Sequence, residues 1–276
     1  MQYTEVDITL EKIVPFSEII IAKLDILKFD TFQEHDNGLK CYIQTNLLDK
    51  NKLSKILDDV SNQTKLEYSL RKMPEKNWNL EWEKNFQPIE INSKCFIRSN
   101  FHDHNGTYDH EIIITPKMSF GTGHHETTFL MINKMYDLNF SKKSVLDMGC
   151  GTGILSILSY KMGANNVLGI DIDEWAYKNS LENSDLNNIH DIEFIKGDIN
   201  SINNCSFDII LANINRNIIL QDISEYYKLL NKDGEILISG FLEEDLEKIS
   251  NAALKLGIVI INKKNKGKWY LMHLKK

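Results

Sequence analysis

The sequence of 276 residues contains little of what several protein classes require. Its four cysteines lie far apart and form no C-x-x-C pair, which favours reduced thiols in a cytosolic protein. Apolar runs are short, and the longest cluster, Ile19–Ala22, is far below the ~20 residues of a membrane span. The N-terminus is polar and resembles no secretory signal. We therefore expect a cytoplasmic protein without a membrane segment.

Basic residues are also in the minority. Lys and Arg number 32 against 39 Asp and Glu, which gives a net charge of −7 at pH 7. Because phosphate binding needs a basic surface, we expect no direct nucleic-acid binding. The remaining composition is that of a globular protein, with 42% hydrophobic and 26% charged residues, which excludes wholesale disorder.

The first part of the chain alternates between strand and helix patterns. Val6, Ile8 and Leu10 alternate like a strand, and the Asn37-Gly38 turn is typical of a hairpin. Residues 15–28 and 48–60 have helical apolar spacing. The resulting order, β-α-β-β-α-β, predicts a small ferredoxin-like α+β domain over residues 1–71, and other α+β packings stay open.

A linker is expected over residues 72–96. It contains Trp78, Trp82 and Phe86 at positions i, i+4 and i+8, which places the three rings on one face of a helix. That face either packs between two domains or holds a substrate.

Residues 97–276 are predicted to form the larger domain. From Ser144 onward, short β-rich runs alternate with amphipathic helices, which is typical of a parallel sheet with helices on both faces. The expected strands are 144–148, 167–170, 192–195, 208–211 and 235–239. A final hairpin, 258–262 and 268–274, favours a methyltransferase fold over a dehydrogenase fold.

Five of the 14 glycines lie between residues 121 and 153, and three of them follow a predicted strand. Gly149, Gly151 and Gly153 have the spacing G-x-G-x-G, whereas a dinucleotide loop has G-x-G-x-x-G and binds a pyrophosphate. Asp147 stands two residues before the first glycine. Its carboxylate would repel a pyrophosphate but suits the ammonium group of S-adenosylmethionine. We therefore expect S-adenosylmethionine as the cofactor.

Acidic and amide residues end the next three strands, where ligands of such sheets bind. Asp171 stands about 20 residues after the first glycine of the loop, and a carboxylate there can accept hydrogen bonds from both ribose hydroxyls. Asp173 is an alternative candidate for a helix cap. Asp198 either contacts the adenine or forms a turn. Asn213 either faces the reaction site or caps the next helix.

A second glycine loop, residues 116–128, lacks the G-K-[ST] of a phosphate loop. Thr127 or Thr128 is expected to cap the following helix or to contact the cofactor. Five histidines invite a metal site, but the region lacks the Cys or carboxylate partners of zinc, so no metal is expected. They are His102, His104, His110, His124 and His125.

With the linker, the two loops resemble the family of ribosomal protein L11 methyltransferases (the PrmA type). The resemblance covers essentially the whole chain, and its most specific parts are residues 78–88, 120–128, 147–153 and 212–214. It implies a class I methyltransferase domain preceded by a domain that recognises the ribosomal protein. The departure is His124-His125-Glu126 where the family usually has Thr-His-Pro. The cofactor contacts implied are Thr128, Gly149, Asp171 and Asn213, with Phe120 lining the transfer site.

The resemblance implies transfer of methyl groups to amino groups of ribosomal protein L11, on lysine side chains, the N-terminal α-amine or both. No Asp–His or Cys–His pair indicates a general base. We therefore expect acceptor groups near Asn213 to orient a neutral amine whose proton leaves to water. Two alternatives stay open: methylation of another amine, and a cofactor-binding module without catalysis.

Overall fold

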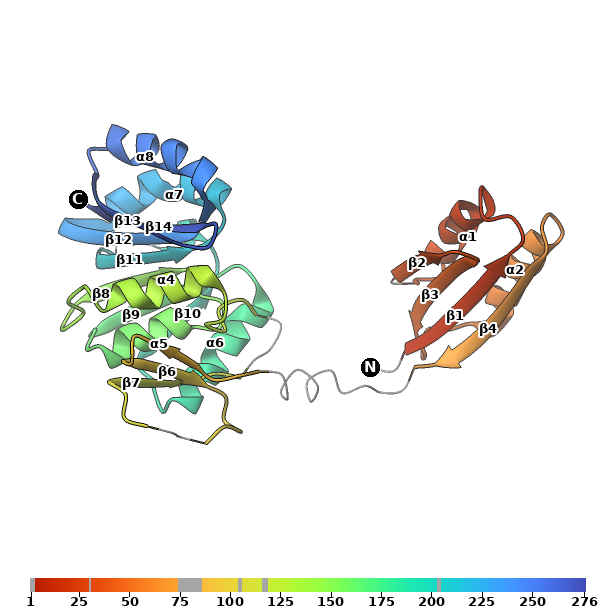
Figure 1. Cartoon of the computed structure of the whole chain (residues 1–276), viewed down its shortest axis with the longest axis horizontal. Coiled ribbons are helices and arrows are strands. Elements are labelled where there is room, and N and C mark those ends of the chain that lie inside the picture. The colour runs from red at the N-terminus through yellow and green to blue at the C-terminus, as the bar shows by residue number, and fades with distance from the viewer. Residues whose placement is uncertain (1–2, 30, 74–85, 104–105, 116–118, 203–204) are drawn as a thin grey trace. The chain divides into compact units, whose positions relative to one another are not determined.

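The computed structural model describes residues 3–29, 31–73, 86–103, 106–115, 119–202 and 205–276. The chain divides into two compact units, Met1–Leu80 and Glu81–Lys276 (Figure 1). Within the described ranges, no helix is both long enough and apolar enough to cross a membrane.

The first unit has the predicted ferredoxin-like order. Its four strands pair antiparallel in the order β2-β3-β1-β4. Val6 and Ile8 are fully buried, and the α2 residues Leu53, Leu57 and Val60 pack in the same core. The elements are β1 (Tyr3–Leu10), α1 (Phe16–Asp25), β2 (Thr31–His35), β3 (Gly38–Gln44), α2 (Lys50–Ser61) and β4 (Leu66–Lys72).

The second unit is built on a seven-stranded sheet of order β10-β9-β8-β11-β12-β14-β13. The first five strands are parallel, and β14 runs antiparallel to both of its neighbours. This confirms the predicted class I sheet with a terminal hairpin. The strands are β8 (Ser144–Met148), β9 (Asn166–Asp171), β10 (Ile192–Lys196), β11 (Phe207–Asn213), β12 (Leu230–Leu242), β13 (Val259–Lys266) and β14 (Trp269–Lys275).

Helices cover both faces of this sheet (Figure 1). Side chains alternate along each strand, so Val145 packs with α4 and α5 whereas Leu146 packs with α7 and α8. Burying one such aliphatic side chain stabilises the fold by about 1.5–3 kcal/mol. The helices are α4 (Glu126–Met135), α5 (Ile154–Lys161), α6 (Glu174–Leu186), α7 (Arg216–Leu229) and α8 (Leu246–Lys255).

A three-stranded sheet, β5-β6-β7, precedes α4 and was not anticipated from the sequence. Its strands are β5 (Ile89–Ile91), β6 (Cys95–Arg98) and β7 (His110–Ile113), each too short for alternation to be recognised. Residues 89–96, expected as linker, therefore contribute to this sheet. Phe86 is buried in the core beneath it, whereas Trp78 and Trp82 of the expected aromatic helix lie outside the described residues.

Candidate active site

The glycine loop follows β8 and leads into α5. Gly149 and Gly151 have positive φ angles of 67° and 57°, a region that favours glycine. A Cβ on Gly149 would lie 2.3 Å from Ile214 Cγ2, and one on Gly151 would lie 2.3 Å from the carbonyl oxygen of Phe120. Three chain segments therefore meet here so closely that no side chain fits between them.

Asp171 lies at the mouth of this loop, at the end of β9. Its Oδ2 accepts a hydrogen bond from the backbone N–H of Gly151 at 2.9 Å, and its Oδ1 accepts one from Asp173 at 3.0 Å. The carboxylate is thus held in one orientation while the residue stays partly exposed. Asp173 caps α6 by accepting hydrogen bonds from the N–H groups of Trp175 and Ala176.

Asn213 lies at the end of β11, next to α4. Its Nδ2 donates to Thr128 Oγ1 at 3.3 Å, and its Oδ1 is buried without a partner among the described residues. The cap of α7 is Asn215, whose Oδ1 accepts hydrogen bonds from two backbone N–H groups. The helix-cap alternative for Asn213 is therefore wrong. A buried amide oxygen without a partner is costly, so a ligand that donates to it would bind favourably.

Aromatic rings adjoin this site. Phe120 is 53% exposed, and its ring lies 5.2 Å from the imidazole of His125, which lies 4.9 Å from the ring of Trp269. His125 rather than a threonine caps α4, because its Nδ1 accepts the N–H of Thr127. The same nitrogen lies 2.8 Å from Oγ1 of Thr127, so Thr127 occupies Nδ1 of His125 with two contacts.

His125 and Trp269 were not expected from the sequence as methyl-transfer site residues, for different reasons. His125 stands inside the same glycine loop as Phe120, five residues after it, and this short separation was an available signal. Trp269 is far away in the sequence and reaches the site only because β14 pairs with β12. No local pattern indicates that pairing.

Asp147 requires a correction. Its carboxylate was expected beside the cofactor ammonium, but the side chain is buried, with 1% exposed. Its Oδ2 accepts hydrogen bonds from the N–H and the hydroxyl of Ser156, at 3.0 and 2.6 Å. Burial, with Asp171 nearby, raises the pKa of Asp147 to about 7. The residue joins the end of β8 to the first turns of α5 instead of facing a ligand.

The other candidates have structural partners. Asp198 caps a short 3-10 helix (Ile199–Ser201), as the turn alternative predicted. His110 shares a hydrogen bond with Tyr136, and the ring of His124 packs against Phe86. His104 lies outside the described residues. In the ranges that the structure describes, no three His, Cys, Asp or Glu side chains are grouped as metal ligands would be.

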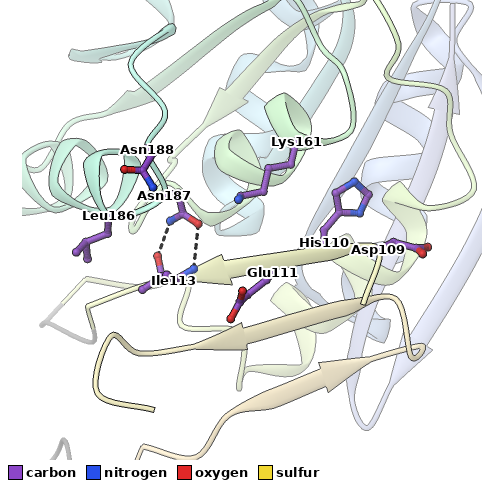
Figure 2. A pocket seen from close by; sticks show the side chains of 8 residues that line it. All are labelled: Asp109, His110, Glu111, Ile113, Lys161, Leu186, Asn187 and Asn188. Atoms are coloured by element: carbon purple, nitrogen blue, oxygen red, sulfur yellow. Dashed lines mark hydrogen bonds between the residues drawn. The ribbon is translucent and has the colours of Figure 1, made fainter. Parts of the chain in front are cut away.

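A cavity of about 440 Å³ lies away from the glycine loop, Asp171 and Asn213 (Figure 2). None of the predicted site residues lines it. Its walls come from β7 and from the C-terminal ends of α5 and α6, whereas the glycine loop adjoins the N-terminus of α5. The lining residues are Asp109, His110, Glu111, Ile113, Lys161, Leu186, Asn187 and Asn188.

Comparison with known proteins gives consistent matches. The family model described as ribosomal protein L11 methyltransferase (PrmA) matches residues 17–276. A ribosomal protein L11 methyltransferase of Phocaeicola vulgatus is 41% identical over 273 residues, which cover 98% of this chain and 97% of the relative. One of Bacteroides thetaiotaomicron is 42% identical, with 92% and 91% covered.

Solved structures agree with these matches. A ribosomal protein L11 methylase of Lactobacillus delbrueckii subsp. bulgaricus is 29% identical, with a TM-score of 0.64 over 68% of this chain and 97% of that one. A methyltransferase of Pyrococcus furiosus is 17% identical, with a TM-score of 0.50 over 59% of this chain and 88% of that one, and shares the fold.

Asp147 should make stability depend on pH. Its pKa is about 7 in the folded protein and near 3.9 in an unfolded chain, so between these values the folded state holds a proton that the unfolded state has lost. This contribution to stability is complete below about pH 4 and disappears as the pH rises through about 7. Between pH 5 and 7.5 we expect the wild type to lose roughly 2–3 kcal/mol of unfolding free energy relative to Asp147→Asn. Urea titrations measure this difference, and parallel pH curves would contradict it.

Proposed function

Because the chain belongs to the family of ribosomal protein L11 methyltransferases, we propose that it transfers methyl groups from S-adenosylmethionine to amino groups of ribosomal protein L11. The acceptors are lysine side chains, the N-terminal α-amine or both. The observation that carries the proposal is the buried Oδ1 of Asn213, which has no partner among the described residues and lies at the sheet edge that holds the glycine loop and Asp171. The proposed place of action is the cytoplasm, where ribosomal proteins are assembled.

The residues at this edge fit S-adenosylmethionine. The carboxylate of Asp171 suits the two ribose hydroxyls, and Ile172 beside it is 73% exposed and offers an apolar surface to the adenine. At Gly149 the lack of a side chain lets the backbone approach the amino-acid part of S-adenosylmethionine, and Thr128 and Asn213 are the proposed polar contacts of that part. When bound, the cofactor supplies a sulfonium methyl group as the electrophile.

The acceptor amine must lose its proton before it can react. At pH 7 this costs roughly 4.6 kcal/mol for a lysine of pKa 10.4 and about 1 kcal/mol for an α-amine near 7.8. His125 holds the N–H of Thr127, and Asp147 is buried against Ser156, so neither is free to act as a base. We propose that the proton leaves to water while Asn213 orients the neutral nitrogen.

The aromatic rings complete the proposed transfer site. Phe120 and Trp269 flank His125, and such rings exclude water and attract ammonium groups through their faces. An amine held against these rings has a restricted direction of approach. Positioning of this kind contributes up to ~7–11 kcal/mol to a bimolecular reaction, so it supplies much of the rate without a general base.

We propose that residues 1–71 recognise the ribosomal protein and that residues 97–276 catalyse, with the expected linker of residues 72–96 joining them and contributing residues 89–96 to the sheet of the second unit. Every proposed site residue belongs to the second compact unit, and none belongs to the first. A net charge of −7 also favours a basic partner such as a ribosomal protein.

The methyl-transfer proposal is tested with labelled S-adenosylmethionine and a total ribosomal protein extract. Label should enter L11, and Asn213→Ala should lower turnover at least about tenfold while weakening cofactor binding less, because the amide also orients the amine. Asn215→Ser is the matched control, since serine keeps the α7 cap. Label on another protein would indicate a different amine substrate. No label despite cofactor binding would indicate a module without catalysis.

The recognition role is tested with a fragment that begins at Met73 and keeps every residue of the second unit. It should bind the cofactor with the affinity of the full chain. Its methylation of L11 at limiting substrate should fall by more than about 100-fold, because substrate binding contributes directly to kcat/KM. Equal rates for the fragment and the full chain would show that residues 1–71 do not recognise L11.

A further inference from the structure

Thr152, in the middle of the glycine loop, bonds to two other segments of the second unit. Its side chain is fully buried. Its backbone N–H donates to the carbonyl oxygen of Phe120 at 2.9 Å, and its hydroxyl donates to that of Gly121 at 2.6 Å. Its own carbonyl accepts a hydrogen bond from Asn183 Nδ2 at 2.9 Å. All its polar groups are therefore used to hold loops together, and its side chain does not face the site.

The two loops are in contact backbone to backbone. A Cβ on Gly121 would lie 2.9 Å from the hydroxyl of Thr152, and one on Gly151 would lie 2.3 Å from the carbonyl oxygen of Phe120. Glycine is thus required at both 121 and 151, where the two loops touch. A shift of the cofactor loop must move residues 120 and 121 with it or break these hydrogen bonds.

Side chains of helix α6 and of its C-terminal end also hold the contact between the glycine loop and residues 120–121. Besides bonding Thr152, Asn183 accepts the N–H of Thr115 at 2.8 Å, so one buried amide connects the glycine loop to the chain that follows β7. One helical turn later, Asn187 bonds both the N–H and the carbonyl of Ile113, as Figure 2 shows. These two side chains fix Ile113 and Thr115, and Asn183 joins Thr115 to the glycine loop.

Phe120 itself has little side-chain packing to hold it. Its ring is 53% exposed, and its ring contact is with His125. Its position at the transfer site therefore depends on its backbone, which Thr152 holds. Loss of the Thr152 hydroxyl would leave the carbonyl of Gly121 without its donor in a buried place, and that segment would become more mobile.

We propose that Thr152 is a positioning residue that couples the cofactor loop to Phe120, so that an ordered cofactor loop fixes the aromatic side of the methyl-transfer site. The inference rests on the proposed function for the role of Phe120. The hydrogen bonds between Thr152 and residues 120–121 do not depend on that function.

The first test is amide hydrogen exchange of the full chain without cofactor. Thr152→Val keeps the shape and the backbone N–H but removes the hydroxyl, and we expect exchange in peptides covering residues 119–125 to rise about three- to tenfold. Thr152→Ser should restore protection. Ser159→Ala removes another buried hydroxyl bond, to Leu155 of α5, and should leave residues 119–125 unchanged. Unchanged exchange in a folded Thr152→Val protein would overturn the proposal, whether or not L11 is a substrate.

The second test separates coupling from general damage. Thr152→Val should lower kcat about three- to tenfold and change the affinity for S-adenosylhomocysteine less than twofold by calorimetry. In a Phe120→Ala background the same substitution should lower kcat less than twofold, because its effect passes through Phe120. Equal losses in both backgrounds would mean that Thr152 acts independently of Phe120. Inactivity of the wild type on L11 would count against the proposed function, and the exchange experiment would still decide the coupling.

Discussion

The close backbone contact around the glycine loop is the constraint on which the second unit depends. Gly149 lies against Ile214, and a Cβ on Gly240 would lie 2.2 Å from the carbonyl oxygen of Ile214. These contacts bring the ends of β8, β11 and β12 to one place without intervening side chains. Buried aliphatic residues on both faces of the sheet hold the strands in that register. The packing of the fold therefore assembles the site.

This arrangement determines what the site can do. Among the described residues, the polar groups at the sheet edge include a fixed, partly exposed carboxylate and a buried amide oxygen without a partner, and the nearby histidine is occupied as a helix cap. Such a site binds hydroxyls and ammonium or amine groups well and removes protons poorly. It fits a reaction in which the cofactor brings the reactive group and the protein supplies orientation.

Much of this could be predicted from the sequence. The strands of the large sheet are short β-rich runs that alternate with amphipathic helices, so their positions could be predicted. Asp171 and Asn213 lie at one edge of the sheet because β9 and β11, which flank β8, run parallel to it and end on the same side. The short strands β5 to β7 carry too few residues for a pattern. The direction of the Asp147 side chain and the approach of Trp269 depend on tertiary packing, which spacing does not encode.

The central claim is that the cofactor binds at the edge formed by the glycine loop and Asp171. The most direct measurement is calorimetric titration of S-adenosylmethionine into the wild type, Asp171→Asn and Asp173→Asn. The two variants lose the same charge two residues apart, and asparagine keeps the cap that Asp173 provides for α6. We predict at least about tenfold weaker binding for Asp171→Asn and unchanged binding for Asp173→Asn. Equal affinities for both variants and the wild type would place the cofactor elsewhere and contradict the account.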